Sequence, residues 1–148
     1  MIKRLAVTKA VAAMLADASQ MPVGRGQKPK ADPPYYLLYS VDTDLSGAPF
    51  TDLNEDASLV YQVTAVSGPS TSTASSAGYL DQAEWMADKA REAFLSRDPR
   101  TGDWVYPLTV PGYRVICREL ETEPGGTSDP TDGIISYVQR FRLDWTPA

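Results

Sequence analysis

The pattern of apolar and polar positions predicts a long amphipathic helix near the middle of the chain, over residues 76–97. Apolar side chains recur there at spacings of three and four, which places them on one helical face. They are Leu80, Ala83, Ala87, Ala90 and Phe94. Ser75 or Ser76 can cap the start of this helix, and Asp98-Pro99 ends it. Because a one-sided helix must bury its apolar face, we expect it to pack on the strands predicted before and after it.

The remaining periodic segments predict a first helix over residues 2–18 and four strands, over residues 34–41, 58–67, 113–121 and 134–145. The last strand has a clear period of two. One side of it carries Ile135, Tyr137, Phe141, Leu143 and Trp145, and the other carries Ser136, Arg140, Arg142 and Asp144. The order α-β-β-α-β-β predicts an α+β fold, with both helices packed on one face of a mainly antiparallel four-stranded sheet.

The segments between these elements are rich in proline, glycine and small polar residues, which is typical of loops. We expect long loops at about 21–33, 42–57, 68–77 and 122–133. The first is a proline-rich extended connector and the third is a low-complexity polar linker. A chain of 148 residues is an ordinary size for one domain, so we expect a single domain over residues 1–148.

The charge and hydropathy of the chain narrow the possible partners. The net charge of −5 argues against general affinity for nucleic acids or anionic membranes. No run approaches the roughly 20 apolar residues of a membrane span, so no membrane partner is expected. The first 19 residues imitate a secretory signal, but Lys9 interrupts their apolar region, and we expect a packed helix instead.

The sequence offers little catalytic chemistry. It has no histidine, which excludes the Ser-His-Asp and Cys-His nucleophile systems, and its one cysteine, Cys117, reads as a small core residue of a strand. The stretch Asp42-x-Asp44-x-Ser46-Gly47 matches the opening of an EF-hand loop, but Leu53 stands where that loop needs a bidentate glutamate. We therefore expect a protein that is not an enzyme and that carries no cofactor and no metal.

Two charged groups remain as candidate interaction surfaces. The connection between the first two strands contains no Lys or Arg and is crowded with acids, namely Asp42, Asp44, Asp52, Glu55 and Asp56. The exposed face of the sheet would carry Arg114, Arg118, Arg140 and Arg142. These arginines are either a docking surface for an acidic neighbour or an ordinary solvated face with cross-strand pairs to Glu119 or Asp144.

The arrangement as a whole, over about residues 2–145, resembles the tail terminator (head–tail joining) proteins of long-tailed bacteriophages (siphoviruses), especially those of actinobacterial hosts. The resemblance rests on the first strand PYYLLYSV, an acidic connection and the closing strand VQRFRLDW. Its most telling part is the strand Tyr61-Gln62-Val63-Thr64-x-Val66 followed, through a small-residue linker, by the helix LDQAEWMADKAREAF.

The resemblance implies a homo-oligomeric ring, usually a hexamer, that assembles in the host cytoplasm and lies at the tail–neck junction of the virion. Such a ring caps the tube of the major tail protein, stops its polymerisation and presents a surface to the neck or connector protein. An acidic lumen would let genomic DNA pass without binding it. We expect the 42–56 acids to face the lumen or the tube. The alternatives are another neck connector or minor tail protein, and a small-molecule-binding α+β domain.

Overall fold

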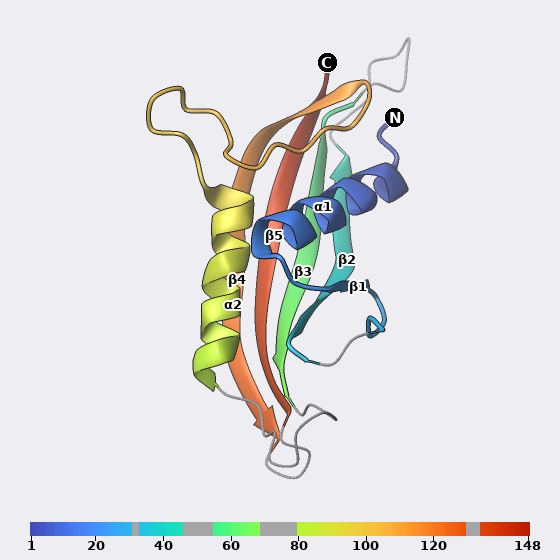
Figure 1. Ribbon diagram of the computed structural model, residues 1–148. Coiled ribbons are helices and arrows are strands. Elements are labelled where there is room, and N and C mark those ends of the chain that lie inside the picture. Colours follow the sequence, from blue (N-terminus) through green and yellow to red (C-terminus); the bar gives the residue numbers. More distant parts are fainter. Residues whose placement is uncertain (31–32, 46–54, 69–79, 130–133) are drawn as a thin grey trace.

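A computed structural model describes residues 1–30, 33–45, 55–68, 80–129 and 134–148. These residues form two helices, α1 (Arg4–Ser19) and α2 (Leu80–Leu95). They also form the strands β1 (Val23–Arg25), β2 (Tyr35–Leu45), β3 (Ala57–Ser67), β4 (Tyr113–Asp129) and β5 (Ile134–Pro147). Both helices lie on the same face of one sheet, as predicted (Figure 1). The α+β class is therefore confirmed.

The sheet has five strands in the order β1-β2-β3-β5-β4, and not the four that were predicted. The additional strand, β1, lies in the proline-rich segment that was predicted to be an extended loop, and it pairs in parallel with β2. Gly24 permits this pairing, because a Cβ atom at that position would lie 2.1 Å from the Gln27 carbonyl oxygen and 3.1 Å from Leu37 Cδ2. The other three pairings are antiparallel. The sheet is therefore mixed.

Two of the other predicted loops are shorter than expected in the part of the chain that the structure describes. β2 continues to Leu45, and β4 continues through the predicted 122–133 loop as far as Asp129. The remaining parts of the predicted loops, residues 46–54, 69–79 and 130–133, lie outside the described residues, as does the predicted start of the central helix.

The core lies between the two helices and the sheet. α2 buries four of the five residues of its predicted stripe together with Met86 and Ala93, whereas Leu80 at its start is 49% exposed. The rings of Phe94 on α2 and Phe141 on β5 stack with their centroids 4.1 Å apart. Burial of this apolar interface is the main source of stability for the two-layer arrangement.

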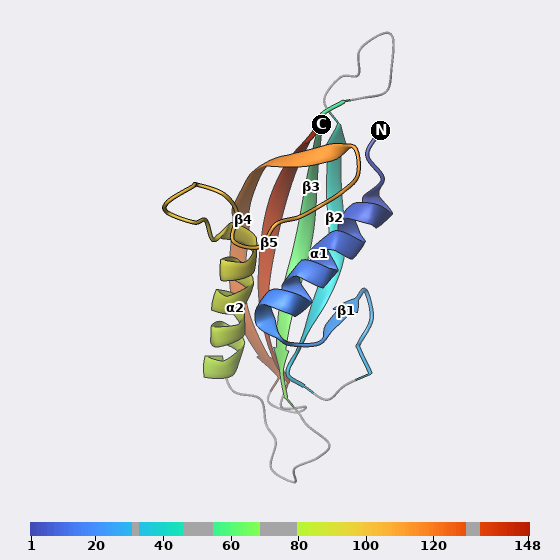
Figure 2. The same cartoon turned by 45° about the horizontal axis from the view of Figure 1, so that its top comes forward.

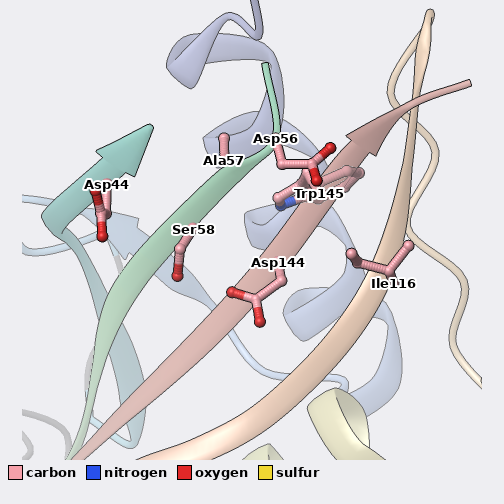
Figure 3. Close-up of a pocket in the computed structure, with 7 residues that line it drawn as sticks. All are labelled: Asp44, Asp56, Ala57, Ser58, Ile116, Asp144 and Trp145. Atoms are coloured by element: carbon pink, nitrogen blue, oxygen red, sulfur yellow. The ribbon is translucent and has the colours of Figure 1, made fainter. Parts of the chain in front are cut away.

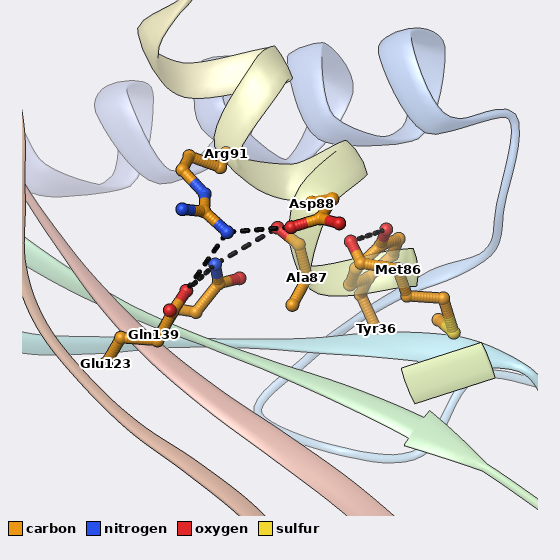
Figure 4. A network of polar contacts seen from close by, with 7 residues as sticks. All are labelled: Tyr36, Met86, Ala87, Asp88, Arg91, Glu123 and Gln139. Atoms are coloured by element: carbon orange, nitrogen blue, oxygen red, sulfur yellow. Dashed lines mark hydrogen bonds and ion pairs between the residues drawn. The ribbon is translucent and has the colours of Figure 1, made fainter. Parts of the chain in front are cut away.

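Polar contacts fasten α2 to the sheet beneath it (Figure 4). The hydroxyl of Tyr36 on β2 donates to the Met86 carbonyl at 2.6 Å, and the amide of Gln139 on β5 donates to the Ala87 carbonyl at 3.0 Å. Gln139 also donates to the Glu123 carboxylate on β4 at 2.6 Å. Because Tyr36 and Gln139 are fully buried, these bonds fix the position of the helix on the strands.

Candidate interaction surface

The face of the sheet opposite the helices is the candidate interaction surface. Within the described part of the chain no helix covers it, as two views show (Figures 1 and 2). We call it the free face. Leu59, Tyr61 and Val63 of β3 point into the core, so the alternate residues of that strand point to the free face. These are Ser58, Val60, Gln62, Thr64 and Val66.

One end of the free face is acidic. Asp44 on β2 and Asp144 on β5 lie directly across from Ser58 on either side. Together with Asp56 they line a pocket of about 250 Å³ (Figure 3). The remaining lining residues are Ala57, Ser58, Ile116 and Trp145, and Ile116 is 50% exposed. Three carboxylates beside an exposed apolar side chain favour an occupant with a cationic head and an apolar stem.

The middle of the free face carries both signs of charge. Arg142 pairs with the Glu119 carboxylate on β4 at 2.8 Å and with the Asp144 carboxylate at 3.3 Å. Arg140 donates from Nε to the Gln62 side chain at 3.3 Å. The cross-strand pair with Glu119 that the sequence suggested therefore exists for Arg142, and the pair with Asp144 lies within β5. A docking role for these arginines stays a prediction.

The opposite end of the free face is aromatic and aliphatic. Tyr39, Leu37 and Tyr35 of β2 follow one another there at alternate positions. Val66 on β3 lies across from Tyr35, and Val138 on β5 lies across from Thr64. The free face thus changes along its strands from acidic, through mixed charge, to apolar.

The predicted acidic connection is, in part, a strand. Asp42 and Asp44 belong to β2, and a bulge between Ser40 and Asp42 turns both toward the free face, because Asp42 lies across from Val60. Asp56 is exposed and accepts a hydrogen bond from Thr146 at 2.6 Å, whereas Glu55 is buried. Asp52 lies outside the described residues. The Asp42–Asp44 carboxylates therefore lie on the same face as Arg140 and Arg142, and not on an opposite side of the molecule.

The prediction that Arg118 lies on the exposed face is wrong. A bulge between Val115 and Cys117 shifts the alternation of β4 by one residue, so that Arg118 points to the helix side and is 5% exposed. Arg114, by contrast, is exposed. Of the four predicted arginines, Arg140 and Arg142 thus lie together on the free face, and Arg118 does not join them.

Arg118 is a buried cation held by carbonyl groups and an aromatic ring. Its guanidinium donates to the Tyr106 carbonyl at 2.8 Å and to the Phe94 carbonyl at 3.4 Å, and it lies 4.5 Å from the centroid of the Trp104 ring. Phe94 belongs to the last turn of α2, where the helix dipole favours positive charge. Burial, and to a lesser extent the charge of Arg97, lowers the pKa of Arg118 to about 10. Arg118 is thus a structural residue that ties β4 to the segment after α2.

Sequence reasoning missed Gln139 and the burial of Arg118. Gln139 could have been found from the sequence. It is a polar residue in the series of alternate, otherwise apolar positions of β5 that point into the core. A bulge has no comparable signal in the sequence of one strand.

Among the described residues, no group of three or more His, Cys, Asp or Glu side chains is arranged to hold a metal ion. The thiol of Cys117 is free and half-buried. No helix within the described ranges combines the length and the apolar character that a membrane crossing requires.

In the part of the chain that the structure describes, the protein is a two-layer α+β sandwich with both helices on one face of the sheet. Known protein families, compared as sequence models, give no match, and neither do curated protein sequences. Solved structures do match. One is a chain of the virion of a native gene transfer agent particle, with a TM-score of 0.58 and 14% identity, covering 95% of this chain and 94% of that one. Another has a TM-score of 0.51 and 18% identity, covering 98% of this chain and 95% of its own. At these identities the likeness establishes a shared fold.

Proposed function

We propose that this chain is a structural protein of a phage-like virion. The observation that carries the proposal is the fold shared over nearly the full length of both chains with a component of a gene transfer agent virion. The match covers 95% of this chain and 94% of the other, so it is not confined to one supersecondary motif. The sequence resemblance to tail terminator proteins supports the same class independently.

Within that class we infer the tail terminator role: a ring, hexameric in the resembling family, that caps the tail tube and joins it to the neck. The free face supports this role, because neither of the two described helices covers it and its charge changes from end to end. Closed rings are built from heterologous contacts, in which two different surfaces of one chain meet around an axis. A lumen lined by acids such as Asp42 would repel DNA phosphates and let the genome pass without binding.

A tube-capping assay tests this function. The purified chain is mixed with polymerising major tail tube protein, and tube lengths and tube ends are measured by negative-stain electron microscopy. A terminator produces tubes that stop growing and carry a ring at one end. Tubes that keep growing in the presence of excess protein would refute the terminator role. Binding to a purified neck protein without any effect on tubes would indicate a neck connector instead.

The acidic residues provide a second test of the same role. Replacing Asp42, Asp44, Asp52 and Asp56 with serine should impair the joining of tails to necks while the monomer stays folded, as judged by circular dichroism. Unchanged joining would show that these carboxylates take no part in it.

A further inference from the structure

The segment after α2 forms a short hairpin that stands away from the helix–sheet sandwich, which we call the arm (residues 96–105; Figures 1 and 2). Its two sides are joined by backbone bonds from Val105 N–H to the Ser96 carbonyl at 3.0 Å and from Asp98 N–H to the Asp103 carbonyl at 2.8 Å. At the turn, Gly102 N–H donates to the Asp98 carbonyl at 2.7 Å. Such a turn is ordered before any partner binds, which lowers the entropy cost of docking.

Side-chain contacts hold the base of the arm. The guanidinium groups of Arg97 and Arg118 lie 4.0 Å and 4.5 Å from the centroid of the Trp104 ring. Arg118 also donates to the Tyr106 carbonyl at 2.8 Å, just after the arm ends. Because Arg118 is buried in the sandwich, it anchors the projecting arm to the rigid part of the fold.

The tip of the arm presents Arg100, which is exposed. Its backbone is fixed, since its N–H donates to the Asp98 carboxylate at 2.8 Å. Among the described residues, none of the ion pairs involves the Arg100 guanidinium. The arm therefore places an available cation at the end of a preformed support.

The acid-lined pocket of the free face has the complementary chemistry. It combines the carboxylates of Asp44, Asp56 and Asp144 with the exposed side chain of Ile116, on which the methylene stem of an arginine can lie. Asp44 takes part in none of the ion pairs between described residues. No arm residue lines the pocket of its own chain, and the lining includes Asp44, Ser58 and Asp144 of the free face (Figure 3). A contact between arm and pocket is thus a contact between two copies.

We propose that the arm of one copy inserts Arg100 into the Asp44–Asp56–Asp144 pocket of the next copy. This contact is heterologous, because two different surfaces meet, and such contacts form a ring when the rotation between successive copies completes a full turn. The inference rests on the proposed function insofar as that function requires copies to assemble. Beyond that function, the inference identifies the two surfaces that meet between copies and the residues that pair there.

Charge exchange tests the pairing. The variants Arg100→Glu and Asp44→Arg are prepared separately, and each is measured alone and in an equimolar mixture by light scattering and negative-stain microscopy, with and without tail tube protein. Lys28→Glu and Asp17→Arg serve as matched controls, because they make the same charge changes at other exposed positions. Circular dichroism establishes that every variant is folded.

We expect each single variant to lose at least about tenfold in apparent association constant, because like charges then face one another across the contact. The mixture should recover assembly, since each glutamate tip meets an arginine pocket and each arginine tip meets an acidic pocket. Both controls should assemble like the wild type.

The inference is overturned if wild-type rings form and either single variant assembles equally well, or if the mixture fails to recover. It is also overturned if the variants keep their rings and lose only tube binding, because the arm would then dock on the tube protein. In these cases the proposed terminator role survives. A wild-type chain that stays monomeric even with tube ends present overturns both.

Discussion

Replacing Arg118 with methionine should loosen the arm while leaving the global stability nearly unchanged. Methionine keeps an unbranched stem in the core and removes the guanidinium. The charged hydrogen bond to the Tyr106 carbonyl at 2.8 Å is worth about 1.5–3 kcal/mol, and the contact with Trp104 adds about 0.5–2 kcal/mol. These favourable contacts are opposed by a desolvation cost. The buried guanidinium forms no ion pair within the described residues, and burying such a cation costs several kcal/mol.

These opposing terms act on different equilibria. Global unfolding returns Arg118 to water, so the attraction and the desolvation cost nearly cancel, and we expect a change within about 1 kcal/mol. Local opening of the arm breaks the attractive contacts while Arg118 stays largely within the sandwich. We therefore expect the arm to lose about 2 kcal/mol of local stability, which corresponds to roughly 30-fold faster amide exchange.

Hydrogen exchange measured by NMR separates the two effects. The amides of Asp98, Gly102 and Val105 report on the arm, and the amide of Tyr36, which donates to the Pro22 carbonyl at 2.9 Å, reports on the distant edge of the sheet. Urea unfolding gives the global value. Arm amides that exchange at the wild-type rate would refute the anchoring role of Arg118. A uniform acceleration at all four amides, with a loss above about 3 kcal/mol in urea, would refute the cancellation.

Three further outcomes are expected. Gly24→Ala should detach β1, because the added Cβ would lie 3.1 Å from Leu37 Cδ2 on β2 and 2.1 Å from the Gln27 carbonyl oxygen just after β1. The amide of Tyr36 should then lose exchange protection while β3 and β5 keep theirs. Phe94→Ala should lower the free energy of unfolding in urea by about 3–5 kcal/mol, since it removes a fully buried ring stacked on Phe141. Burial raises the pKa of Tyr36, so the folded state keeps its proton above pH 10 while the unfolded state loses it, and stability falls as pH rises. Between pH 9 and pH 11 the wild type should therefore lose about 1.4 kcal/mol more than Tyr36→Phe, and equal losses would contradict this assignment.

The local periodicity of the helices and strands could be predicted from the amino-acid sequence. Spacings of three and four along α2 placed Ala83, Ala87, Ala90 and Phe94 in the core, and only Leu80, at the helix start, departs from that pattern. The alternation of β5 likewise separated Phe141, Leu143 and Trp145 from Arg140 and Arg142. These assignments succeeded because both periods are properties of one element and repeat within a few residues.

How the strands pair and which charged side chains meet could be read only from the folded chain. The bulge after Val115 depends on the register of β4 against β5, and one residue of shift moves Arg118 from the solvent side to the core side. The parallel pairing of β1 with β2 depends on the close approach of Leu37 on β2 to Gly24 on β1. The pairing of β2 and β5 with β3 brings Asp44 and Asp144, which are 100 residues apart in the chain, to the two sides of Ser58, where they line the pocket. Register is set by contacts between strands distant in sequence, so no pattern within one strand could specify it.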